Sequence, residues 1–360
     1  MKIDMFAHVI PQKYIDSFEK NNERRISFTK ISGDALKLGY PVLTDPDKRL
    51  EVMARYEGYA QVLVPIGDVM EPIMNVRDTA RLKTIYNDFL SEWFDKYPSN
   101  YLGAAATIPL NDTEAALKEI ERAITQLGFK GIVMHTPVIP YEEGAPIEKG
   151  VNFENIKPLD SPEFWPIYEA MSKHNLPIWI HPHGLTGVPV YKGEPRGKYM
   201  LFHIFGWPIE TMMAMSRLVC SGVLAKYPNL RFITHHCGSM LVPGLASRVD
   251  EEFDRFVYSG ELHWDKLGQA ETFKIRRPLE YFKMFYGDTA LYGGTDGLEL
   301  GFKFFGPEHV VFGTDFPMDM DKGTKFLDWT IEAVNRMHIS DGEQQMIYEG
   351  NAKNLLRLKT

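Results

Sequence analysis

Histidine and aspartate residues stand at the ends of several short apolar segments of this chain. His8 closes the first such segment, His181 closes the fifth, and Asp315 lies near the end of the last. Neutral imidazoles and a carboxylate are common ligands of Zn, Mn and Fe ions. If the segments are parallel strands that end at one rim, these residues meet there although they are far apart in the chain. The pattern predicts a mononuclear metal site with His8, His181 and Asp315 as its ligands.

Other polar groups at the segment ends are candidates for proton transfer and substrate binding. The sixth segment ends in His235-His236. We expect His236 to move protons beside the metal, because imidazole titrates near neutral pH, whereas His235 either packs or adds a ligand. Asp288, at the end of the seventh segment, could bind substrate or orient a histidine. His135 and His183 are further candidates for substrate contact.

The spacing of the apolar segments predicts an α/β fold. Several segments are continuous rather than alternating, as in parallel strands that are covered on both faces. The eight expected strands are Lys2–Val9, Tyr59–Pro65, Leu102–Leu110, Gly128–Thr136, Leu176–Pro182, Leu230–His236, Phe282–Thr289 and His309–Phe316. Helical patterns between them cover Asp78–Tyr97, Thr113–Leu127, Ser161–His174, Pro208–Tyr227 and Lys322–His338, and a terminal helix runs through Arg357. Asp112, Ser161 and Ser340 are candidate N-caps.

This alternation of strands and helices favours a (β/α)8 TIM barrel that forms one domain over residues 1–360. A doubly wound open sheet is the alternative, but it normally has a glycine-rich turn after its first strand. The turn His8–Pro11 contains no glycine. Two long loops, Pro137–Asp160 and His183–Trp207, would lie over the catalytic end of such a barrel.

Composition narrows the class of protein. The content of 44% hydrophobic and 24% charged residues is typical of a globular chain, and a net charge of -8 without a basic cluster argues against nucleic acid as a partner. Neither a leader pattern nor a long apolar run is visible, so we expect a cytoplasmic protein without membrane association. Cys220 and Cys237 form no disulfide or zinc pattern, and we expect reduced thiols.

Ordered motifs along nearly the whole chain resemble the amidohydrolase superfamily, in particular its branch of non-oxidative decarboxylases typified by aminocarboxymuconate semialdehyde decarboxylase and γ-resorcylate decarboxylase. The matching segments are Ile3–His8, Leu159–Phe164, Leu176–Pro182, Gly206–Thr211, Ser221–Pro228, His236 with Gly238, Arg248–Asp250 and Gly313–Pro317.

The resemblance implies roles for particular residues. It makes His8, His181 and Asp315 metal ligands and His236 the catalytic proton carrier. Arg248 matches an arginine that reaches a substrate carboxylate across a dimer interface, which suits a bidentate guanidinium. A homodimer, or a higher oligomer, is therefore expected.

The first strand departs from the family pattern. That strand usually carries a His-x-His pair, or Glu as its first member, but here the first member is Phe6. Phenylalanine cannot bind a metal. Either the metal retains three protein ligands plus water, or Asp4, His135, His183 or His235 fills the gap. A third alternative is that the chain has lost its metal and serves as a partner subunit.

The favoured function is a metal-dependent lyase that removes carbon dioxide from an aromatic or unsaturated small carboxylic acid. His236 and Asp315 would protonate the carbon that loses its carboxyl group. We expect Zn, with Mn or Fe as alternatives. Hydrolysis is closely related chemistry. The different alternatives are a non-haem iron or manganese oxygenase on the same barrel, suggested by extra histidines, and a non-catalytic subunit of a hetero-oligomer, suggested by Phe6.

Overall fold

Eight parallel strands form the centre of the molecule in the computed structural model. The structure describes residues 1–21, 27–28, 34–66, 70–140, 156–182, 198–238, 240–259 and 277–358. The strands are β1 (Lys2–Val9), β2 (Tyr59–Pro65), β3 (Tyr101–Thr107), β4 (Gly131–Thr136), β5 (Ile178–Pro182), β6 (Phe232–Thr234), β7 (Tyr286–Asp288) and β8 (Val310–Val311). Each pairs in parallel with the next, in the order β1 to β8. The chain after β8 returns to β1 through an Ala7–Phe316 bridge, so the predicted (β/α)8 barrel is confirmed.

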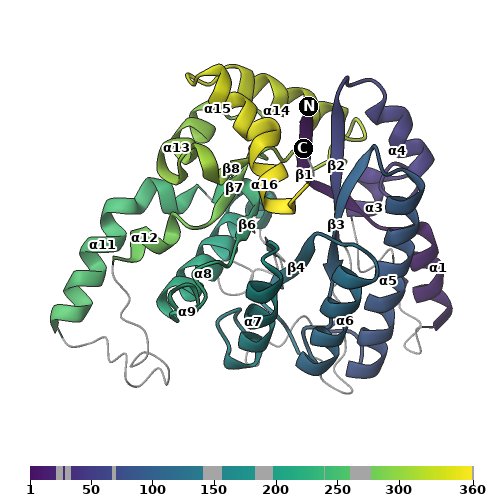
Figure 1. Ribbon diagram of the computed structural model, residues 1–360, viewed down its shortest axis with the longest axis horizontal. Helices are drawn as coiled ribbons and strands as arrows, with labels where there is room; N and C mark the ends of the chain where they lie inside the picture. Colours follow the sequence, from purple (N-terminus) through teal and green to yellow (C-terminus); the bar gives the residue numbers. More distant parts are fainter. Residues whose placement is uncertain are drawn as a thin grey trace.

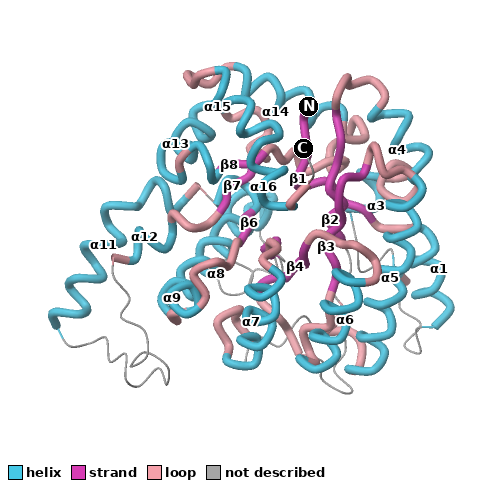
Figure 2. The backbone as a smooth tube through the Cα atoms, viewed as in Figure 1, coloured by secondary structure: helices cyan, strands magenta, loops and turns pink. Residues whose placement is uncertain are grey.

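Helices surround this barrel, with the strands at the centre (Figures 1 and 2). They are α1 (Gln12–Asn21), α3 (Asp34–Gly39), α4 (Pro46–Met53), α5 (Val76–Lys96), α6 (Thr113–Thr125), α7 (Trp165–His174), α8 (Trp207–Cys220), α9 (Val223–Lys226), α10 (His235–Gly238), α11 (Leu241–Ser259), α12 (Pro278–Phe282), α13 (Thr295–Phe305), α14 (Thr324–Asn335), α15 (Asp341–Gln345) and α16 (Asn351–Leu356). Among the described residues, no helix combines the length and the apolar character that a membrane span needs.

The helix predictions were right in position and incomplete in number. The predicted helix Pro208–Tyr227 is divided into α8 and α9, because Gly222 between them has a left-handed φ of 82°. The helices that were not predicted are α1, α3, α4, α10, α11, α12 and α13. In α13 the pattern is weakened by Gly301, which is needed because an added Cβ would lie 2.2 Å from Cys237 Sγ.

The three N-cap predictions had different outcomes. The side chain of Asp112 accepts a hydrogen bond from the backbone of Ala115 at 3.1 Å. Ser340 forms a capping box with Glu343, so each side chain bonds the other residue's backbone N–H. Ser161 was wrong: it precedes a short 3-10 turn, makes no side-chain capping bond, and α7 begins only at Trp165.

The interior of the barrel is a small apolar core beneath the strand ends. Its buried side chains are Ile3, Met5, Phe6, Val62, Val64, Ala105, Val133, Trp179, Ile233 and Val311, joined by Ala352, Leu355 and Leu356 of the C-terminal helix α16. Trp179 is fully buried, and its indole N–H donates to the carbonyl of Met5 across the barrel at 2.7 Å. The C-terminal helix and Trp179 therefore fill the space below the rim at which the functional side chains gather.

Replacing Trp179 should test this core. We expect Trp179→Ala to lower the free energy of unfolding by about 3–5 kcal/mol, because it leaves a large cavity inside the barrel. The matched control is Trp329→Phe at a 39% exposed tryptophan, which should stay within about 0.5 kcal/mol. Denaturant midpoints measure both, and equal midpoints for the two variants would contradict the assignment of Trp179 to the core.

Candidate metal centre

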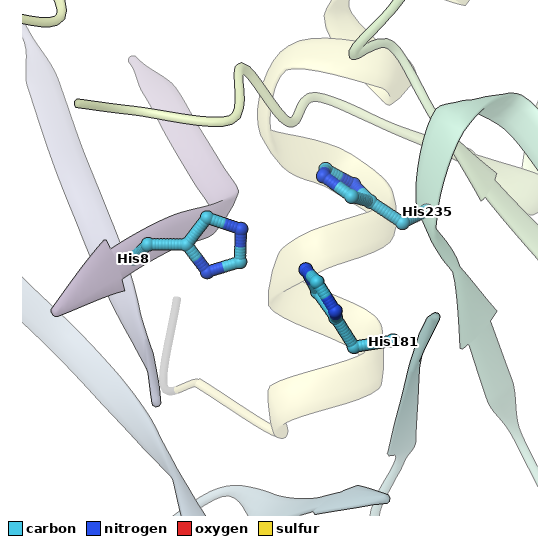
Figure 3. A group of neighbouring side chains, drawn as sticks. All are labelled: His8, His181 and His235. Atoms are coloured by element: carbon cyan, nitrogen blue, oxygen red, sulfur yellow. The ribbon is translucent and has the colours of Figure 1, made fainter. Parts of the chain in front are cut away.

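Imidazoles from three strand ends converge at the C-terminal rim of the barrel. His8 lies on β1, His181 lies on β5, and His235 directly follows β6; Figure 3 shows their rings pointing toward one another. One ring nitrogen of each lies within 4.8 Å of the other two. Asp315, after β8, places Oδ1 3.0 Å from His8 Nε2 and 3.2 Å from His235 Nε2. All four side chains are buried.

A left-handed turn directs the two consecutive histidines to the same region. β6 ends at Thr234 rather than at His236, because His236, Cys237 and Gly238 have φ values of 53°, 52° and 64°. Left-handed backbone costs energy for residues with a Cβ and is often found at functional sites. It places a ring nitrogen of His236 within 4.8 Å of ligand atoms of both His235 and Asp315.

The histidines are oriented by acceptors on their Nδ1 side. His235 Nδ1 makes a short contact with Asp288 Oδ2, and His181 Nδ1 lies 2.7 Å from the carbonyl of Pro182. A carbonyl or carboxylate only accepts, so each Nδ1 carries a hydrogen, and Nε2 is the nitrogen left to face the centre.

Three of these Nε2 atoms have no hydrogen-bond partner although they are buried: those of His181, His235 and His236. Buried polar atoms are nearly always paired, so such a group of orphaned nitrogens needs an explanation. Atoms that bind one zinc ion tetrahedrally at about 2.1 Å lie about 3.4 Å apart, close to the separations around Asp315. The residues present therefore fit a divalent cation.

Charge at the centre favours positive species. Burial alone would raise the pKa of Asp315, but the close contacts with His235 and His8, and their charge, hold this pKa well below its usual range. Burial lowers the pKa of His235, yet Asp288 and Asp315 more than offset this and raise it to about 9. An arrangement that stabilises a protonated imidazole would also stabilise a cation.

His181 and His236 are held in the neutral form. Burial and the neighbouring His8, His135 and His235 keep the pKa of His181 well below its usual value. Burial and His235 lower the pKa of His236 to about 4. His236 Nδ1 lies 3.0 Å from the carbonyl of Ala290, which leaves its Nε2 as the atom that can accept a proton.

Two further residues, which have no motif in the sequence, support the candidate ligands. The Tyr292 hydroxyl donates to Asp315 Oδ2 at 2.9 Å. The fully buried Arg49 donates from Nη1 to the carbonyl of His8 at 2.7 Å, and its guanidinium lies 4.7 Å from the centre of the Phe316 ring. Arg49 therefore connects the backbone of His8 to Phe316, the residue that follows Asp315.

The remaining predicted residues lie in different surroundings. Asp288 is fully buried, and its Oδ1 accepts from the backbone N–H groups of Cys237 and Ala290 at 2.9 and 3.1 Å, which favours orienting His235 over binding substrate. His135 is buried on β4 with its ring 5.4 Å from that of His181. Arg248, on α11, has a 71% exposed side chain and pairs with Glu252 at 3.3 Å. The prediction for His183 lies outside the described residues.

The model of the family described as "Amidohydrolase" matches residues 3–358. This chain belongs to the amidohydrolase family. Among its relatives, the 2-amino-3-carboxymuconate-6-semialdehyde decarboxylase of Dictyostelium discoideum is 23% identical over 99% of this chain and 92% of the relative. The γ-resorcylate decarboxylase of Polaromonas sp. JS666 is 26% identical over 87% of each chain, and the 6-methylsalicylic acid decarboxylase of Penicillium expansum is 30% identical over 70% of this chain and 67% of the relative.

Several solved structures have the same fold as this amidohydrolase. The dihydroxybenzoic acid decarboxylase of Polaromonas sp. JS666, with bound manganese and 2-nitroresorcinol, superimposes with a TM-score of 0.75 at 23% identity and covers 99% of this chain and 97% of its own. The 5-carboxyvanillate decarboxylase of Novosphingobium aromaticivorans, also with manganese, has a TM-score of 0.78 at 20% identity over 99% and 97%.

The turn after β6 offers a stability test. We expect Gly238→Ala to destabilise this amidohydrolase by at least about 2 kcal/mol, because φ is +64° and the added Cβ would lie 2.5 Å from Phe305 Cζ. At Gly342, with nothing within 4 Å, the control Gly342→Ala should not destabilise. If Gly238→Ala melts with the wild type, the left-handed turn is wrong.

Proposed function

We propose that this amidohydrolase is a metal-dependent, non-oxidative decarboxylase of a small aromatic or unsaturated carboxylic acid. The observation that carries the proposal is the group of buried imidazoles and the Asp315 carboxylate at the barrel rim, with unpartnered Nε2 atoms. Active sites of such barrels lie at this end of the strands. The relatives named as decarboxylases of aromatic and muconate-type acids support the choice of reaction.

One divalent cation would be held by His8, His181 and Asp315. A donor set rich in imidazole suits Zn²⁺, and Mn²⁺ is the alternative that the manganese in two neighbouring structures supports. When bound, the ion would supply positive charge to the carboxylate of the substrate and to a neighbouring hydroxyl.

The residues of the chain divide the remaining work. In decarboxylation the bond between the carboxyl carbon and its neighbour breaks, carbon dioxide leaves, and the electron pair that stays behind takes up a proton. The neutral Nε2 of His236, which is buried and unpartnered, would take up a proton from water and pass it to that carbon. The low pKa of Asp315 keeps it ionised, so its part is to balance charge beside His236 rather than to donate the proton.

Arg248 would hold negative charge of the substrate in a neighbouring active site. Its exposed guanidinium has only Glu252 as an ion-pair partner among the described residues, which leaves donors for a carboxylate. This role requires a homodimer or higher oligomer. We also propose a cytoplasmic location.

Metal content tests the ligand assignment. The wild type should bind about one ion per chain, whereas His181→Ala and Asp315→Ala should lose most of it. His338→Ala, at a 93% exposed imidazole, is the control and should keep the wild-type content. Unchanged content in both ligand variants would show that the assignment is wrong.

Carbon dioxide release tests the reaction. Metal-loaded protein should release carbon dioxide from at least one member of a panel of hydroxybenzoates and muconate-type acids. His236→Ala should lower kcat by about 100- to 10,000-fold without loss of metal. Hydrolysis of lactones or amides without carbon dioxide release would instead favour a hydrolase, and turnover that requires oxygen would favour an oxygenase.

A further inference from the structure

The gap left by Phe6 lies beside an imidazole from the opposite side of the barrel. The Phe6 ring stacks on the His235 ring with their centres 3.8 Å apart and their planes at 15°. Phe6 therefore does not leave the ligand position empty: it fills that space with a flat apolar surface against which a second ring is held.

The Nε2 atom of His235 faces the candidate ligands. It lies 3.2 Å from the same Asp315 oxygen that His8 approaches at 3.0 Å, and it is buried without a hydrogen-bond partner. It shares a 4.8 Å neighbourhood with the nitrogens of His8 and His181. A short distance to Asp315 without hydrogen-bond geometry fits two ligands that share one ion better than a donor and its acceptor.

On its other side, His235 is fixed as a metal-binding histidine usually is. Asp288 accepts a hydrogen bond from Nδ1–H and itself accepts hydrogen bonds from the backbone N–H groups of Cys237 and Ala290. A carboxylate behind the ligand fixes the ring and raises the basicity of Nε2.

The other described candidates for the gap do not have this geometry. Asp4 accepts four hydrogen bonds: from the Phe6 and Thr314 backbone at 3.0 and 3.1 Å, from the Tyr59 hydroxyl at 2.7 Å and from the Thr314 hydroxyl at 2.5 Å. His135 belongs to neither group of ligand atoms that lie within 4.8 Å of one another in the described part of the chain.

We propose that His235 replaces the first-strand ligand that Phe6 cannot supply, so that one cation is held by His8, His181, His235 and Asp315. Phe6 is then a positioning residue for the His235 ring. This inference rests on the proposed metal-dependent function. It also gives the two adjacent histidines different roles: His235 binds the ion and His236 transfers the proton.

Spectroscopy of the wild type tests the ligand count without any variant. The full-length protein is loaded with Mn²⁺, and pulsed electron paramagnetic resonance counts the imidazole nitrogens on the ion. Three coordinated imidazoles are expected, and two would overturn the inference. Absence of any bound Mn²⁺ or Zn²⁺ would instead overturn the proposed function itself.

Exchange variants test the same point by affinity, measured by chelator competition with Zn²⁺. His235→Ala should weaken binding by at least about 100-fold, and Asp288→Asn by about 10- to 100-fold. The double variant Phe6→His/His235→Ala should regain at least about tenfold over His235→Ala, because it returns an imidazole to the neighbouring place. His236→Ala should bind within about threefold of the wild type.

The competing explanation is a structural imidazolium, in which a proton on Nε2 pairs His235 with Asp315. In that case His235→Ala would keep wild-type Zn²⁺ affinity while the melting temperature fell. Adding Phe6→His to that variant would then not change the affinity. If His235→Ala does not fold, His235→Asn provides the affinity measurement, and the spectrum of the wild type still decides.

Discussion

The shared carboxylate of Asp315 is the contact around which the rim of this barrel is organised. A buried carboxylate is costly unless positive or donor groups surround it, and here imidazoles of His8 and His235 approach one oxygen while Tyr292 donates to the other. These groups come from β1, from α10 directly after β6, and from the loop after β7. The site therefore forms only when the sheet closes, because the groups that stabilise the Asp315 carboxylate come from different parts of the barrel.

The backbone at the rim is strained where it brings these side chains together. Asp315 itself has a φ of 65°, and the turn after β6 continues in the left-handed region over three residues. Such conformations persist only when their surroundings fix them. The buried Arg49 guanidinium, which binds the carbonyl of His8 and lies over the Phe316 ring, and the apolar core around Trp179 supply that rigidity.

The barrel could be predicted from the sequence because strands that are buried on both faces are continuous apolar segments. Strands β1 and β2 have the predicted bounds, Lys2–Val9 and Tyr59–Pro65. At the end of β6 the prediction ran too far, because the same polar residues that mark a strand end also leave the extended conformation. The convergence of His8, His181 and Asp315 follows from topology, so strand ends alone were enough to suggest it.

Contacts between distant residues without a motif could not be predicted. Neither the support of His8 by Arg49 nor the bond from Tyr292 to Asp315 has a local signature, since each depends on where two loops meet. The stacking of Phe6 on His235 joins opposite sides of the barrel. The sequence shows that Phe6 occupies a position where the family has a metal ligand. Only the structure shows that the His235 ring packs against it.

Anomalous diffraction from a crystal of the metal-loaded protein tests the central claim most directly. Data collected on both sides of the absorption edge of the bound ion should give one strong difference peak per chain, bounded by the Nε2 atoms of His8, His181 and His235 and by the Asp315 carboxylate. A fully loaded crystal with its peak elsewhere, or with these side chains directed away from the ion, would contradict the account.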